Sequence, residues 1–388
     1  MNKKIHLGLI VPFKGIKKVI ISYKFTLNEL SKYFENIYVI NSEYLEFFPE
    51  TYKSYENTDL YDHLNKNINL INPKNYYEFK EFIKNKKLVL IDALGNSFSE
   101  IKARFLLNQN NIDQIMISNV GNIQGSAKPI LSKFLSYYFF KKVPYFITLF
   151  LYGIGILKKI KVRFVTNKDI FENFKKKKFS YVEKILLINS RSFDESKLNQ
   201  NLLENNSILF LNPDINHPEW ISKRGHINHE DEKKIYKIFE FFLDKLSSFY
   251  KKKVVVCIHP NNSLNGIQNL FKKYEIIQFK TPENIRKAHV VVFADSSSVV
   301  EAIILKKRII CITKLEMNNN DLNFIPAYHN QGLFEMILNE NMQIDFDNLD
   351  KNLLNSIKNY EKFNNRFGIP DGKNIGVTKI VEYINNNF

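Results

Sequence analysis

The sequence predicts an α/β protein of two domains, each built on a parallel sheet. Short runs of apolar and β-branched residues recur along the 388 residues, and helix-length segments separate them. These runs are continuous and do not alternate with polar residues, which indicates strands covered on both faces. The chain length also suits two domains better than one. Sheets of this kind bind ligands outside the carboxyl ends of their strands, where loops gather.

The composition fits a folded protein with a basic surface. Hydrophobic residues make up 44% and aromatic residues 14%, which excludes a disordered chain. The formal net charge is +16, and the excess is mostly lysine. Two explanations stay open: nucleotide bias in an AT-rich genome, or a surface selected to bind anionic membrane or phosphorylated substrates. The sequence has no RNP-like motif, zinc-finger spacing or arginine cluster, so we expect no nucleic-acid partner.

The two cysteines and the N-terminus indicate a cytoplasmic protein. Cys257 and Cys311 each fall within a predicted buried strand, where we expect core side chains and no disulfide. The N-terminus is basic and then apolar but has no small-residue cleavage site. We therefore expect a first strand at 6–11 and no signal peptide.

The first domain is predicted over residues 1–200. We expect a helix over 99–108 and only short elements over 44–85, where the sequence is polar and poorly periodic. The loop after the first strand contains Gly15, where the backbone can approach a substrate closely. The expected strands are 6–11, 37–41, 87–91, 114–118, 162–166 and 184–189.

Residues 129–158 are unusually apolar and aromatic. The run 143–157 has about 15 residues, short of the ~20 that a membrane-spanning helix needs. Lys141, Lys142 and Pro144 interrupt the segment further. Two alternatives stay open: a buried helical hairpin, or a patch that contacts the membrane surface.

A polar segment over 193–206 separates the domains. The second domain is predicted over 201–345, followed by a helical tail over 346–388 that we expect to pack back on the first domain. A helix over 230–250 has apolar residues at helical spacing. The expected strands are 208–211, 254–258, 275–279, 289–293 and 308–313.

His259 is the sharpest candidate for chemistry. It follows the strand 254–258, so its imidazole can contact an anionic or leaving-group oxygen at the carboxyl edge. Pro260 fixes the backbone beside it, and Asn261 lies in the same loop. The structural alternative is a histidine bonded to a nearby carbonyl group.

Asp295, Ser296, Ser297 and Ser298 follow another predicted strand and precede a helix. Hydroxyl and N–H groups there suit a phosphate, and three consecutive hydroxyls exceed what capping needs. The alternative is a capping box between Ser298 and Glu301.

A further loop, Thr281-Pro282-Glu283, reaches the same edge. Its structural alternative is a helix start with Thr281 as the cap and Pro282 in the first turn.

Together these motifs resemble the GT-B glycosyltransferases of bacterial surface-polysaccharide synthesis, in particular the capsule and lipooligosaccharide enzymes related to sialyl- and polysialyltransferases. The resemblance covers residues 208–315. It depends on Ile258-His259-Pro260, Thr281-Pro282-Glu283, the segment Asp295–Ala302, and Lys306–Ile310. It implies two Rossmann-like domains that face a cleft.

The resemblance implies roles for the residues of these motifs. His259 would contact the donor phosphate or assist the departing nucleotide. Glu301 would bind a donor hydroxyl. Thr281, Glu283, Pro260, Asn261 and Asp295–Ser298 would line the donor site. No metal and no cofactor are expected, because such enzymes need none and His217, His226 and His229 have no matching ligand spacing.

Transfer with inversion also needs a base for the acceptor hydroxyl, and the first domain would supply it. Asp92, at the end of a predicted buried strand, is the candidate, and capping of the next turn is its alternative role.

The sequence therefore predicts a glycosyltransferase that moves a sugar from a nucleotide donor, with a CMP-sugar favoured by the resemblance, to a glycan or glycolipid acceptor. We expect it on the inner face of the cytoplasmic membrane. Two alternatives stay open: a nucleotide-sugar epimerase on the same fold, and a non-catalytic protein that binds a glycan or nucleotide.

Overall fold

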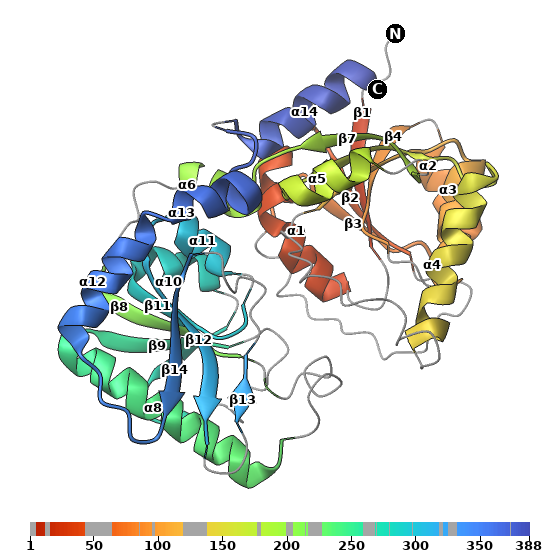
Figure 1. Cartoon of the computed structure of the whole chain (residues 1–388). Coiled ribbons are helices and arrows are strands. Elements are labelled where there is room, and N and C mark those ends of the chain that lie inside the picture. The colour runs from red at the N-terminus through yellow and green to blue at the C-terminus, as the bar shows by residue number, and fades with distance from the viewer. Residues whose placement is uncertain are drawn as a thin grey trace. The chain divides into compact units, whose positions relative to one another are not determined.

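The computed structural model divides the chain into two compact units, each described by itself (Figure 1). Among the described residues, the first unit ends at Asp194 and resumes with Pro370–Phe388, and the second is Glu195–Ile369. The structure describes residues 5–11, 16–42, 64–84, 86–94, 98–118, 138–176, 180–198, 205–213, 215, 227–258, 268, 270–278, 280–296, 298–317, 321–324, 332–372 and 374–388.

The first unit contains a seven-stranded parallel sheet with the order β3-β2-β1-β4-β5-β6-β7. The six predicted strands are confirmed, each within two residues of its expected ends. β3 is an addition that falls in the segment where only short elements were expected. The strands are β1 (Ile5–Val11), β2 (Ile37–Asn41), β3 (Ile68–Ile71), β4 (Lys87–Asp92), β5 (Asp113–Ile117), β6 (Ile160–Val165) and β7 (Val182–Leu187).

Helices cover both faces of this sheet, which explains why its strands are so apolar. α1 (Ile16–Leu30) and α14 (Gly376–Asn387) contribute to the hydrophobic core on one face. α2 (Tyr76–Ile83) and α3 (Phe98–Gln109) contribute to the core on the other. The remaining helices are α4 (Tyr138–Gly153), α5 (Lys168–Lys175) and α6 (Arg191–Leu198).

The second unit repeats this architecture. Its strand order is β10-β9-β8-β11-β12, with β14 parallel to β12 and the short β13 antiparallel to it. The five predicted strands are present, whereas β13 and β14 were not expected. The strands are β8 (Ser207–Leu211), β9 (Lys253–Cys257), β10 (Glu275–Ile277), β11 (Ala288–Phe293), β12 (Arg308–Glu316), β13 (Leu322–Asn323) and β14 (Phe334–Asn339).

The helices of the second unit also cover both faces of its sheet. α8 (His229–Tyr250) buries its apolar stripe on one face, as the spacing predicts. Asn228 caps its first turn through a hydrogen bond from Asp231 N. α11 (Val299–Ile304) and α13 (Tyr360–Phe363) contribute to the core on the opposite face, near α10 (Thr281–Lys287). α12 (Phe346–Ile357) packs beside β12 and β14.

The predicted tail is divided between the two units. α12 and α13 belong to the second unit, and α14 packs on the core of the first. Asp194 caps α14, because its two carboxylate oxygens accept hydrogen bonds from Gly376 N at 2.9 Å and Val377 N at 3.1 Å. The preceding turn is anchored by Asn189, whose side chain bonds three backbone groups of residues 371–374.

Within the described ranges, no helix is long and apolar enough to cross a membrane. The apolar segment predicted at 129–158 is described from residue 138 onward, where it forms α4. α4 has 16 residues, and its Tyr152 packs beside Arg104 of α3.

Candidate functional site

The carboxyl edge of the second sheet contains a topological switch point. From β8 the strand order runs through β9 to β10 on one side and through β11 to β12 on the other. The loops after β8 and β11 therefore lead to opposite directions, which opens a crevice between them. Leu211 at the end of β8 pairs with Cys257 of β9 on one side and with Phe293 of β11 on the other. Position 212 therefore lies between positions 258 and 294 at this edge.

Asn212 follows β8 at the centre of this edge. Its backbone N–H donates to the Cys257 carbonyl at 2.9 Å and so extends the ladder by one residue. The residue is only 5% exposed, and neither Oδ1 nor Nδ2 of its amide has a hydrogen-bond partner among the residues that the structure describes. A buried polar group without a partner costs ~1–3 kcal/mol. A ligand that offers both a donor and an acceptor here would remove that cost.

The sequence interpretation did not select Asn212, although a signal for it exists. A buried strand, then a polar residue, then proline is the pattern that made His259-Pro260 conspicuous. Asn212-Pro213 repeats that pattern one strand away, with a neutral amide in place of an imidazole. The pattern at Asn212-Pro213 would have been a stronger indication of a site if β8 had been known to be the central strand.

Beside Asn212, the chain leaves β11 through Ala294 and Asp295. Asp295 is exposed, and Ser296 and Ser298 are partly buried. Ser296 Oγ accepts a hydrogen bond from Ser298 N at 3.3 Å, which tightens the turn before α11. Ser298 is the N-cap of α11 but makes no side-chain cap bond. Its hydroxyl is therefore not used to cap the helix.

Glu301 does not complete the capping box that Ser298 suggested, and this corrects the structural alternative. Its side chain is buried and accepts from Arg286 NH2 at 3.1 Å. Arg286 also lies 3.7 Å from Glu195, so one buried guanidinium faces two carboxylates. Within the second unit, which begins at Glu195, this arrangement joins α10 and α11. Contact of Glu301 with a donor hydroxyl would require Arg286 to give up part of this pairing.

Thr281 is the first residue of α10 and not its cap, because Lys280 occupies the cap position and Pro282 falls in the first turn. Its Oγ1 lies 2.9 Å from Cys257 Sγ, which ties α10 to the end of β9. Burial raises the pKa of the Cys257 thiol, which favours its protonated form. Glu283 is exposed in the first turn of α10.

In the first unit, Asp92 ends β4 and is fully enclosed. It forms an ion pair with Arg104, whose guanidinium also donates to the Leu94 carbonyl at 3.1 Å and to Tyr152 Oη at 3.1 Å. Asp92 Oδ1 accepts from Leu94 N at 2.8 Å, which is the turn-capping role. A base role for Asp92 would require this buried pair to open.

Five predicted site residues lie outside the described part of the chain. They are Gly15, His259, Pro260, Asn261 and Ser297. Asp295, Ser296 and Ser298 are described next to the newly found Asn212, and Thr281 is described at the end of β9. Among the described residues, no group of three or more metal-ligating side chains occurs.

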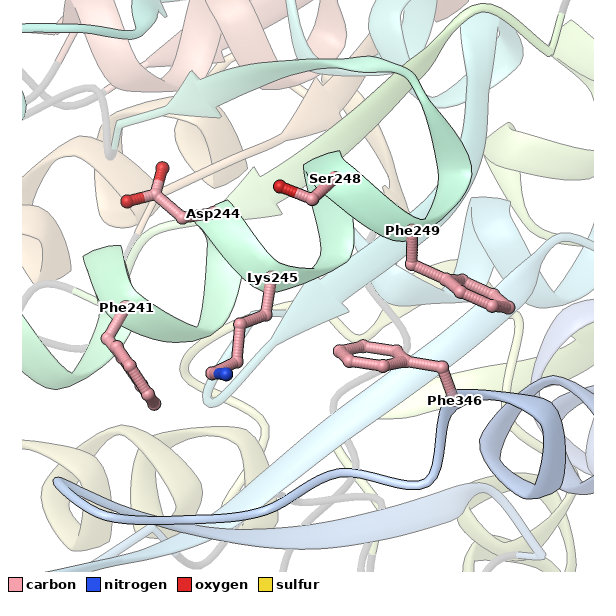
Figure 2. A pocket seen from close by; sticks show the side chains of 6 residues that line it. All are labelled: Phe241, Asp244, Lys245, Ser248, Phe249 and Phe346. Carbon is pink, nitrogen blue, oxygen red and sulfur yellow. The ribbon is translucent and has the colours of Figure 1, made fainter.

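A separate surface depression lies on the outer face of α8 (Figure 2). It measures about 580 Å³ and is lined by Phe241, Asp244, Lys245, Ser248 and Phe249 of α8 with Phe346 of α12. Phe249 and Phe346 stack at 5.0 Å between ring centroids. Because α8 leads directly into β9, these last turns lie at the amino edge of the sheet. The depression is therefore separate from the switch point.

Comparison with known proteins identifies the fold. No protein-family model and no curated protein matches the sequence. Several solved structures match over nearly the whole chain. The wall teichoic acid polymerase TagF has 13% identity and a TM-score of 0.55, covering 99% of this chain and 89% of that one. UDP-GlcNAc 2-epimerase from Methanocaldococcus jannaschii has 14% identity and a TM-score of 0.53, covering 99% and 100%.

Another is a glycosyltransferase from Rickettsia africae ESF-5, with 13% identity, a TM-score of 0.50 and complete coverage of both chains. At such identities the likeness concerns the fold. The chain has two Rossmann-like α/β domains of the GT-B type, as its sequence predicts.

Proposed function

We propose that this protein uses a nucleotide-sugar and transfers its sugar to a glycan acceptor. The observation that carries the proposal is the buried amide of Asn212 at the switch point of the second sheet, which has no hydrogen-bond partner in the described part of the chain. Parallel sheets bind ligands in that crevice, and an amide recognises a base or sugar edge that offers a donor beside an acceptor. The GT-B fold of TagF and of the epimerase is consistent with a nucleotide-sugar ligand.

The phosphates of the donor would lie against the turn after β11. Ser296 and Ser298 supply hydroxyl groups there, and the first N–H groups of α11 follow. Developing negative charge on the departing nucleotide would be stabilised by these groups and by His259 from the neighbouring loop. His259, Pro260, Asn261, Ser297 and Gly15 keep the roles that the sequence predicts for them.

Two of the predicted roles need a rearrangement. Glu301 would reach a donor hydroxyl only by sharing its carboxylate between the ligand and Arg286. Asp92 would act as the base only if its pair with Arg104 opened. Thr281 and Glu283 line the same edge through α10, with Thr281 acting through its contact with Cys257.

The donor and acceptor are proposed from the resemblance. A CMP-activated sugar is the favoured donor, and a surface polysaccharide or a lipid-linked glycan is the favoured acceptor. A nucleotide-sugar epimerase is the second candidate, because structures of UDP-GlcNAc 2-epimerases match the chain at full length.

A thermal-shift screen against CMP, UDP, GDP and TDP tests the donor class. A nucleotide at 100 times its dissociation constant should stabilise the protein by ~2.7 kcal/mol. A response to one nucleotide supports the proposal and fixes the donor. No response to any of them removes nucleotide-sugar chemistry altogether.

A product assay then separates the candidates. Transfer releases free nucleotide only when an acceptor glycan is present, whereas epimerisation converts the donor without an acceptor. If the protein binds a nucleotide but forms neither product, the result supports a non-catalytic binding protein.

A further inference from the structure

Helix α4 of the first unit exposes apolar side chains along one stripe. Phe146, Phe150 and Ile154 follow each other at four-residue intervals and are 55%, 63% and 52% exposed. Ile154 directly follows the last residue of α4, and its N–H donates to the Phe150 carbonyl at 2.9 Å. Spacing of four residues therefore puts the three side chains one above the other on a single face. A surface helix normally carries polar residues on such a face.

The opposite face of α4 is the one packed against the protein. Thr148 and Tyr152 are buried there, and the Tyr152 hydroxyl accepts from Arg104 of α3 at 3.1 Å. The helix therefore directs Thr148 and Tyr152 inward and the rings of Phe146 and Phe150 outward. Because the inner face is fixed by these contacts, rotation of α4 cannot bury the stripe.

Neighbouring residues extend the exposed surface. Asn108 of α3 donates to the Ile156 carbonyl at 3.0 Å, which holds the two helices side by side, as Figure 1 shows. Phe105 lies one turn before Asn108 and is 41% exposed, and Ile156 is 44% exposed. We name Phe105, Phe146, Phe150, Ile154 and Ile156 the α4 patch.

Positive charge adjoins the α4 patch. Lys158 and Lys159 follow it directly and are exposed, with the Lys158 ammonium in contact with Asn111. The whole chain carries a net charge of +16. Aromatic and aliphatic side chains beside lysines match the apolar and anionic layers of a lipid surface.

We propose that the α4 patch inserts shallowly into the surface of an anionic bilayer, with α4 lying along it. The 16 residues of α4 are fewer than the ~20 needed to span the hydrocarbon core, which suits a helix lying in the interface. Charge favours anionic lipid as the partner of the α4 patch. A second copy of this chain also carries a net charge of +16 and would be repelled, whereas anionic lipid is attracted. The proposal is independent of the function proposed above.

Sedimentation of the full-length protein with lipid vesicles tests the proposal. We expect binding to vesicles that contain phosphatidylglycerol, weaker binding to phosphatidylcholine alone, and a decrease as salt is raised. Phe150→Ser/Ile154→Ser should lower partitioning ~10-fold or more, because the apolar contact is lost. Lys158→Glu/Lys159→Glu should weaken binding to anionic vesicles only.

The matched control is Phe241→Ser/Phe249→Ser, which removes two rings that are 37% exposed on α8 of the second unit. This variant should bind vesicles as the wild type does. All variants should have the same melting temperature in solution, which shows that any difference in vesicle binding does not come from misfolding. Unchanged binding of Phe150→Ser/Ile154→Ser, or no vesicle binding by the wild type, would overturn the proposal. So would a wild-type dimer that this variant converts to a monomer, because a second copy would then cover the patch.

Discussion

Replacing Asn212 by leucine should stabilise the ligand-free protein and weaken its nucleotide binding. Leucine has nearly the shape of asparagine but no polar atoms. It would remove the two amide atoms at the end of β8 that are buried and have no partner among the described residues. Substitution of a buried asparagine normally destabilises a protein, so a gain in stability is a distinctive expectation.

The size of the effect follows from the cost of unpaired groups. Each costs ~1–3 kcal/mol, and relaxation around the site recovers part of it, so we expect a gain of ~1–3 kcal/mol. For a unit of this size each kcal/mol raises the melting temperature by ~2–4 °C. In the presence of nucleotide this gain shrinks by up to ~1.4 kcal/mol, because the wild-type amide gains hydrogen bonds that leucine cannot make. A loss of one such bond corresponds to ~10-fold in affinity.

Melting temperature with and without nucleotide is the assay, and Asn189→Leu is the control. Asn189 is equally buried, but its amide donates to the carbonyls of Gly372 and Asn374 and accepts from Asp371 N. Asn189→Leu should therefore destabilise the first unit by ~2 kcal/mol or more. If Asn212→Leu instead lowers stability as Asn189→Leu does and leaves nucleotide affinity unchanged, the argument from the unpaired amide is wrong.

Three further predictions concern stability. Asp194→Ala should lower the free energy of unfolding by ~1–2 kcal/mol in urea titrations, because α14 loses its cap; an unchanged value would mean that the cap contributes nothing. Arg286→Met should lower the free energy of unfolding by ~3–5 kcal/mol, because the buried carboxylate of Glu301 loses its ion pair with Arg286. Arg286→Met/Glu301→Leu should recover part of that loss. If the single and the double variant lose the same free energy of unfolding, the pairing is contradicted. Burial and nearby Arg308 lower the pKa of His289 from 6.5 to about 4. The unfolded chain therefore binds this proton first, and stability falls between pH 6.5 and pH 4. Allowing for partial exposure, the fall is ~1–2 kcal/mol, and His289→Phe should remove it from the pH profile.

The strands of both sheets could be predicted because burial on two faces leaves a strong signal. Runs such as residues 254–258 and 289–293 are apolar without interruption, and the helix 230–250 has clear periodicity. The loops at the carboxyl edge could be predicted from those strands, because parallel pairing determines which loops lie at the same edge.

Other features depend on contacts distant in sequence, which local patterns do not contain. The sequence of β14 mixes apolar and polar residues and does not by itself indicate a strand. It forms a strand because it pairs in parallel with β12. Glu301 looked like a capping residue or a ligand contact, and only tertiary packing brings Arg286 to it. Asp194 and Gly376 are far apart in the chain, so the division of the tail between units could not be foreseen.

Hydrogen–deuterium exchange with the bound nucleotide is the most direct test of where the ligand lies. We predict slower exchange in peptides that contain Asn212 and the turn Asp295–Val299. Protection confined to the first unit, or to the α8 and α12 residues of the depression in Figure 2, would contradict it.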